Sequence, residues 1–195
     1  MNARPETMPE NDLVELLVHQ HEEIRRLFTE VRDADDADRG EAFDRLRRFL
    51  AVHETAEEMI VHPDARRVIA DGDRVVDARL EEENAAKRML EDLEQMDPAD
   101  PAFVSKLTAL QTAVLDHADH EEREEFPRIK AAHSPARLMA MGVAVKAAEA
   151  LAPTHPHSGV ESATANALVG PYAAMMDRAG DVIRQTIGRT SDSDK

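Results

Sequence analysis

Histidine and glutamate occur four residues apart at two places in this sequence. The first pair is His53 and Glu57. The second is His117 and Glu121, and both pairs open the same longer string, H-x-x-x-E-E-x-x-x-x-P. Residues four apart in a helix lie one turn from each other on the same face. If both segments are helical, the two side chains of each pair can therefore bind one ion.

Apolar residues at three- and four-residue spacing predict the elements that position these pairs. Four such stretches indicate helices over about 11–33, 41–62, 73–96 and 101–130. No stretch alternates with a period of two, so we expect no sheet. Four amphipathic helices of about 20 residues joined by short links predict an all-α fold, an antiparallel up-down-up-down four-helix bundle.

The two pairs interrupt the apolar stripes of their helices, on the faces predicted to be buried. In the second helix the stripe runs through His53 and Glu57. In the fourth it runs through His117 and Glu121. One such string is weak evidence for a site, but two on alternate helices, both facing inward, indicate a shared site in the bundle core.

The first and third helices supply the remaining polar residues of this core. His21 lies between Leu17 and Ile24 in the stripe of the first helix. The third helix has no histidine, and its stripe passes through Glu83, which aligns with His21 when the two segments are compared. Asn84, one step away, is the competing assignment.

These predicted core residues favour a pair of metal ions. Bare carboxylates are costly in an apolar interior unless a cation accompanies them. Six ligands are too many for one ion with an open position, and they suit two ions bridged by carboxylates. The chain has no cysteine, and nitrogen and oxygen donors without sulfur favour iron or manganese over structural zinc. The six residues are His21, His53, Glu57, Glu83, His117 and Glu121.

With these motifs the chain resembles the hemerythrin-like family, the HHE cation-binding domains. The resemblance covers about 11–130 and rests on the doubled H-x-x-x-E-E motif and on HisGlnHisGluGluIleArgArgLeuPhe in the first helix. It implies an antiparallel four-helix bundle with a non-haem di-iron centre and an oxo or hydroxo bridge, manganese being the less expected metal. By this resemblance the terminal ligands would be His21, His53 and His117. The bridging carboxylates would be Glu57 and Glu121.

The chain departs from this family in its third helix. The family usually has histidine there, where this chain has Glu83. An anionic oxygen in place of a neutral imidazole should stabilise the ferric state, which favours the carboxylate-rich di-iron proteins over reversible oxygen carriers. Glu54 is a further candidate, because some family members use the acid that follows the histidine of the second helix.

Three functions stay open on these grounds. The first is a di-iron protein that interacts with oxygen, peroxide or nitric oxide, in sensing, detoxification or iron handling. The second is an enzyme, a di-iron oxidase with catalase-like or ferroxidase-like activity that consumes peroxide or oxygen. The third is a metal-free helical interaction module.

Other residues near these stripes have simpler expected roles. His62 and His120 lie beside the stripes, and His120 suits a supporting or solvent-facing position. Glu83 has an alternative as a boundary acid paired with Lys87. The acidic runs 81–83 and 121–125 are expected to be mostly solvated, with one inward member each.

Composition limits the partners and the location. The 195 residues include 40 acidic and 24 basic side chains, a formal net charge of −16. That charge argues against binding of nucleic acid or of an anionic membrane surface. A polar start and the absence of any apolar run of about 18 residues predict a cytoplasmic protein without a membrane span.

The sequence after the bundle has a different character. We expect 131–187 to be a helical extension, with helices over about 134–149 and 164–187, that covers the bundle or forms a homodimer. The segment 188–195 is expected to be a disordered tail.

Overall fold

A computed structural model of the chain describes residues 12–150 and 152. These residues contain helices and no strand, which confirms the all-α class for the described part of the chain. The expected helix over 164–187 and the tail at 188–195 lie outside it. The elements are α1 (Leu13–Asp33), α2 (Arg39–Ala56), η1 (Glu57–Val61), α3 (His62–Val68), α4 (Gly72–Glu94), α5 (Phe103–His120), η2 (Glu121–Glu125), α6 (Phe126–Ala132) and α7 (Pro135–Glu149).

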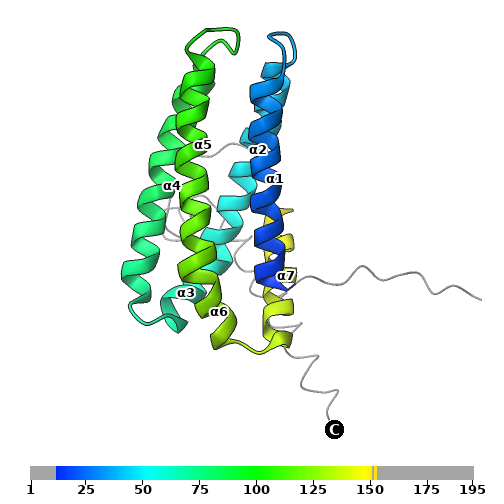
Figure 1. Ribbon diagram of the computed structural model, residues 1–195. Coiled ribbons are helices and arrows are strands. Elements are labelled where there is room, and N and C mark those ends of the chain that lie inside the picture. The colour runs from blue at the N-terminus through cyan, green and yellow to red at the C-terminus, as the bar shows by residue number, and fades with distance from the viewer. Residues whose placement is uncertain (1–11, 151, 153–195) are drawn as a thin grey trace, which may run out of the picture.

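Long helical rods make up most of the described part of the chain (Figure 1). They are α1, α2 continued through η1 and α3, α4, and α5 continued through η2 and α6. Short links join α1 to α2 and α4 to α5 at one end of the rods, and α3 joins α4 at the other end (Figure 1). The shorter α7 lies beside α1 at that second end.

Two apolar clusters fill the two ends of the rods. One lies toward the α1–α2 and α4–α5 links. Its members include Ile24, Phe28, Phe43, Leu90, Phe103 and Leu107. The other lies where α7 packs, and its members include Leu13, Leu17, Val76, Phe126, Ile129, Met141 and Val145. The six residues expected in the site lie between these clusters, so the molecule has a polar layer enclosed by apolar packing.

Two five-residue π-helical turns interrupt rods that the sequence predicts to be unbroken α-helices. The N–H of His62 donates to the carbonyl of Glu57, and the N–H of Phe126 donates to that of Glu121. Pro63 and Pro127 are the second residues of the α-helices that follow the two turns, and proline has no N–H for the bond that an α-helix requires. A π-turn takes up one extra residue, so the side chains beyond it face in a new direction.

The turn into α4 depends on a glycine at a close approach. Asp71 has φ 58°, the left-handed region, and Gly72 begins the helix. A Cβ at Gly72 would lie 2.7 Å from the carbonyl oxygens of Ala65 and Arg66. A larger residue there would force α4 away from α3, and this shift would displace Glu83, which α4 carries.

Within residues 12–150 and 152, each helix is too short or too polar to span a membrane.

Candidate metal centre

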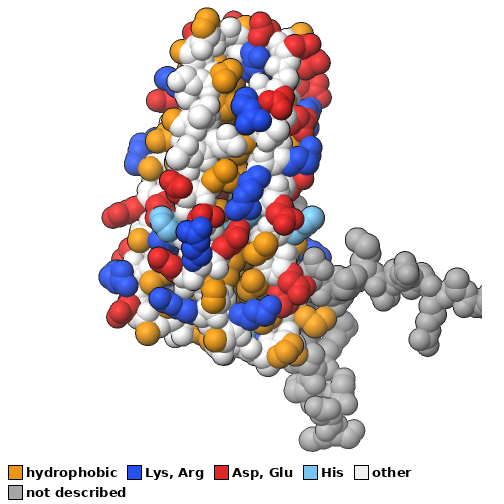
Figure 2. Space-filling model, viewed as in Figure 1, with side chains coloured by type: hydrophobic (Ala, Val, Ile, Leu, Met, Phe, Trp, Pro, Cys, Tyr) orange, Lys and Arg blue, Asp and Glu red, His pale blue; other side chains and the backbone are white. Residues whose placement is uncertain are grey.

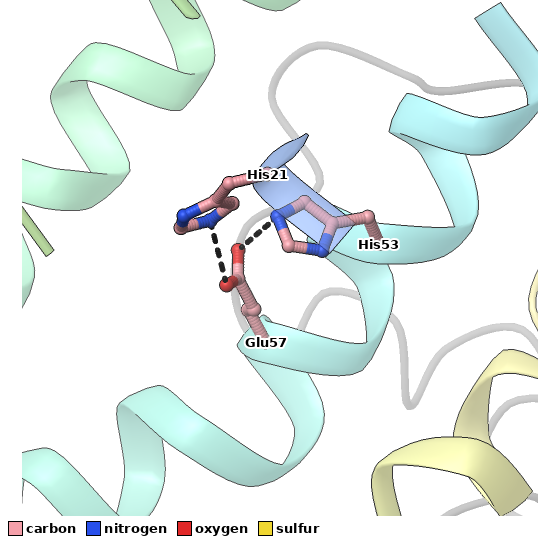
Figure 3. A group of neighbouring side chains, drawn as sticks. All are labelled: His21, His53 and Glu57. Atoms are coloured by element: carbon pink, nitrogen blue, oxygen red, sulfur yellow. Dashed lines mark ion pairs between the residues drawn. The ribbon is translucent and has the colours of Figure 1, made fainter. Parts of the chain in front are cut away.

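The structure brings the six expected residues into one buried layer. The three glutamates are fully buried and the three histidines nearly so, with exposed fractions of 0 % for Glu57, Glu83 and Glu121, 1 % for His21, 4 % for His53 and 7 % for His117. They come from all four rods. Figure 3 shows the rings of His21 and His53 directed at the carboxylate of Glu57.

Two groups of three ligand atoms share Glu57. The first joins His21, His53 and Glu57, and the second joins Glu57, His117 and Glu121; within each group the ligand atoms lie within 4.8 Å of one another. His53 Nε2 is 3.4 Å from Glu57 Oε2, and His21 Nε2 is 4.0 Å from Glu57 Oε1 (Figure 3). His117 Nε2 is 3.5 Å from Glu121 Oε2. A cation in either group would therefore have at least one carboxylate and one imidazole nitrogen at hand.

The outward ring nitrogens of the three histidines are also held. Each Nδ1 lies within hydrogen-bond distance of a side-chain oxygen. An N–H at Nδ1 that donates there leaves the Nε2 lone pair free for a metal, which is how ligand histidines are usually oriented. The contacts are His21 to Glu122 Oε1 at 2.9 Å, His53 to Gln20 Oε1 at 2.8 Å and His117 to Glu82 Oε2 at 3.1 Å.

The inward atoms fit a cation because they contact one another only at ion-pair distances, such as the 3.4 Å between His21 Nε2 and Glu121 Oε2, and make no hydrogen bond among the described residues. The Nε2 atoms of His21 and His117 and both carboxylate oxygens of Glu57 and Glu121 are buried without a hydrogen-bond partner among the described residues. Unpaired buried carboxylate oxygens are costly. A metal ion would satisfy these atoms together, so the residues present fit the group that the doubled motif implies.

The carboxylates of the layer influence one another strongly. Burial, followed by the nearby charge of Glu121, raises the pKa of Glu57 well above its ordinary range. Burial would also raise the pKa of Glu121, but the charge of His117 opposes it and brings that pKa to about 2. Burial lowers the pKa of His53 to about 3, so its ring is neutral, as a ligand must be. Without a cation, one carboxyl of the central pair therefore holds a proton.

Glu83 faces the layer but belongs to neither group of three. Its Oε1 is 2.6 Å from His62 Nε2 and 3.9 Å from His117 Nε2. Its Oε2 is 3.5 Å from Lys87 Nζ, the pairing that the sequence left open. Glu83 is buried, whereas Asn84 is half-buried, so the helix register favours Glu83 over its neighbour as the inward residue.

The sequence pattern does not predict two residues that the structure places in the polar layer. His62, expected beside the stripe, is 3 % exposed, and Glu125 is fully buried. The expectation of one inward acid in 121–125 is therefore wrong, because Glu121 and Glu125 both face inward. The π-turns are the cause, since they change the direction of the residues that follow. The signal was present in the matched prolines, Pro63 and Pro127.

A buried lysine contacts three acids on the α4 side. Lys87 Nζ lies 2.5 Å from Glu58 Oε1 and 3.6 Å from Glu54 Oε2, besides its contact with Glu83. Burial raises the pKa of Glu54 and of Glu58 to about 7, although Lys87 opposes the rise. Glu54, a candidate ligand by resemblance, is thus engaged with a cation of the chain itself. His120 has its Nδ1 2.9 Å from Glu82 Oε1 and is partly exposed.

A small cavity of about 10 Å³ adjoins the centre. That is the space for roughly one water molecule. Its polar wall is formed by His21, His53, Glu54, Glu83 and His117, and its apolar wall by Ile24, Leu50, Ala86, Val114 and Ala118. Any exogenous molecule admitted here without rearrangement has only one or two heavy atoms.

Comparison with known proteins finds a matching family model and a similar solved structure. The family model of the hemerythrin HHE cation binding domain matches residues 12–129. A crystal structure of a hemerythrin HHE cation binding domain-containing protein from Mycobacterium kansasii is similar in fold, with a TM-score of 0.64. The two chains are 20 % identical, and the likeness covers 87 % of this chain and 99 % of the other.

A curated protein from Nostoc sp. named DNA nickase is 29 % identical over 111 residues. The match spans 56 % of this chain but only 31 % of that protein, so most of the relative has no counterpart here.

Proposed function

Because the chain belongs to the hemerythrin HHE cation-binding domain family, we propose that this metal-binding protein holds two iron ions in its central layer. The observation that carries the proposal is the set of buried, unpartnered ligand atoms of His21, Glu57, His117 and Glu121. Their nitrogen and oxygen character suits iron, with manganese second. We also infer that the four rods form an antiparallel bundle, because short links join consecutive rods at alternating ends.

The two groups of three suggest how the ions are divided. His21 and His53 would hold one ion and His117 the other, with Glu57 and Glu121 as the carboxylates available to both. Glu83 belongs to neither group and would complete the ligands of the second ion from α4. The outer partners Gln20, Glu122 and Glu82 keep each imidazole oriented. The domain 11–130 is the metal-binding unit in this proposal, and the segment that follows supports it through the packing of α7.

We propose that the centre acts on oxygen, peroxide or nitric oxide. Bound iron would supply Lewis-acid activation and redox equivalents. The cavity restricts access to molecules of one or two heavy atoms, and its apolar wall keeps bulk water from the reacting position. These properties are compatible with sensing, detoxification or iron handling.

Oxidase activity of the catalase-like or ferroxidase-like kind is the second candidate. Glu83 favours it, since an anionic ligand in the third helix stabilises the ferric state at the expense of reversible oxygen binding. Peroxide turnover that falls in Glu83→Gln would support the oxidase. Inertness toward peroxide and ferrous iron, together with reversible oxygen binding, would exclude it.

Metal analysis of protein purified from iron-replete cells tests the main proposal. We expect about two irons per chain, a clear loss in His53→Ala and in His117→Ala, and no loss in the control His19→Ala, whose side chain is 74 % exposed. Less than about one iron per chain, unchanged in both centre variants, would contradict it. A melting temperature that chelation leaves unchanged would favour the metal-free interaction module instead.

The charge of the chain argues against DNA cleavage. A formal net charge of −16 opposes the phosphate contacts on which nucleic-acid binding depends. Figure 2 shows acidic and basic side chains interspersed on the face in view. A cytoplasmic location and a homodimer remain predictions.

A further inference from the structure

His62 lies beyond the first π-turn, at the start of α3, and its side chain is directed into the polar layer. It is 3 % exposed. Its Nε2 is 2.6 Å from Glu83 Oε1, and the same oxygen is 3.9 Å from His117 Nε2. Glu83 Oε1 therefore lies within 4 Å of two imidazole nitrogens, on the side of the centre where the third helix offers no histidine, although His62 belongs to neither group of ligand atoms that lie within 4.8 Å of one another.

The second ring nitrogen of His62 also lies near a carboxylate, but at a longer distance than in the other centre histidines. Each of those directs Nε2 inward and Nδ1 to a side-chain oxygen outside. His62 Nδ1 is 3.6 Å from Glu125 Oε1, which is longer than a hydrogen bond. That Nδ1 and both oxygens of the fully buried Glu125 have no hydrogen-bond partner among the described residues. Glu125 is thus placed as the acceptor that would orient His62.

We propose that His62 is the fourth imidazole of the centre and binds, with Glu83 and His117, the ion on the α4 side. It replaces the histidine that the third helix lacks, from a different helix and through the π-turn. This inference rests on the proposed function, since it assumes that the layer holds two ions.

The competing arrangement is an ion pair in which His62 only positions Glu83 and Glu125. A direct count of bound imidazoles separates the two, because a positioning histidine contributes no metal–nitrogen bond. Cobalt(II) is a suitable probe: each histidine bound through one ring nitrogen gives one strongly shifted, exchangeable NMR resonance from its other N–H. Burial of the Nδ1 protons slows their exchange with water.

For the dicobalt form of the full chain we expect four such resonances, from His21, His53, His62 and His117. His62→Gln, which keeps a donor for Glu83, should show three, and the exposed-histidine control His19→Ala should show four. The cobalt on the α4 side should bind at least about tenfold more weakly in His62→Gln, because the loss of even an outer partner has that effect.

Three resonances in the unaltered protein would overturn the inference, as would four in His62→Gln. The count in the unaltered protein needs no variant, so the proposal is tested even if His62→Gln folds poorly. If the unaltered chain takes up less than one cobalt and less than one iron, the proposed function fails. Two bound ions with only three resonances would refute the role of His62 alone.

Discussion

The two H-x-x-x-E-E-x-x-x-x-P repeats have the same backbone and different surroundings. Each places a histidine and a glutamate in the polar layer and then makes a π-turn before its proline. The last residue before proline differs. His62 approaches Glu83 with its Nε2, whereas Phe126 stacks on the ring of His21, with centroids 5.7 Å apart and planes at 17°.

The second glutamate of each repeat, Glu58 or Glu122, also has different contacts in the two repeats. Glu58 lies 2.5 Å from the buried Lys87, while Glu122 lies 2.9 Å from His21 Nδ1 and 3.3 Å from the partly exposed Arg25. The α4 side of the centre is therefore ionic and enclosed, and the α1 side is lined by an aromatic ring. The same π-turn with different side chains therefore makes two inequivalent halves of the centre. Only Glu57 belongs to both groups of ligand atoms.

Glu57→Gln should have the largest effect, because it removes the carboxylate that both halves share. We expect iron to fall from about two per chain to less than one, since bridging carboxylates are part of such bundle centres. The control is Glu41→Gln, at an exposed position on α2. Retention of two irons in Glu57→Gln would mean that the halves do not depend on this residue.

Lys87→Met should lower the free energy of unfolding more than the corresponding change on the α1 side. It leaves Glu54, Glu58 and Glu83 without their cation, and removal of one partner from a buried ion pair costs about 3–5 kcal/mol. Urea unfolding of the metal-free protein measures this. Arg25→Met removes the corresponding cation on the α1 side, which is 36 % exposed, and should cost less than about 1 kcal/mol. Equal losses would contradict the contrast between an enclosed and an open side.

The sequence predicts the stripes, the four long helices and the burial of all six residues, because apolar periodicity reports directly on which face of a helix is buried. It does not predict the π-turns. Their effect on His62 and Glu125 depends on how a proline-interrupted backbone adjusts within a packed bundle. Lys87 was visible only as a helical neighbour of Glu83, since its contacts with Glu54 and Glu58 cross between helices.

Gln20→Leu should weaken metal binding without abolishing it. Gln20 Oε1 lies 2.8 Å from His53 Nδ1 and fixes that ring from outside. Loss of such an outer partner typically lowers metal affinity about 10- to 100-fold. Competition with a chelator of known affinity measures the change. An unaltered affinity would show that packing alone orients His53.

Metal binding should tighten as pH rises. In the metal-free protein Glu57 holds a proton, because burial and Glu121 raise its pKa. Burial would lower the pKa of His117, but Glu121 and other acids bring it to about 9, so its ring is protonated near neutrality. Both protons must leave before these groups bind a metal, so affinity should rise up to about tenfold per pH unit for each proton released. Calorimetry in buffers of different ionisation enthalpy counts these protons, and none released would contradict the assignment.

Diffraction from iron-loaded crystals, recorded at the iron absorption edge, tests the two-ion centre most directly. The account predicts two anomalous peaks in the layer between the apolar clusters, both beside Glu57, one next to His21 and His53 and the other next to His117 and Glu83. A single peak, or iron bound only outside this layer, would contradict it.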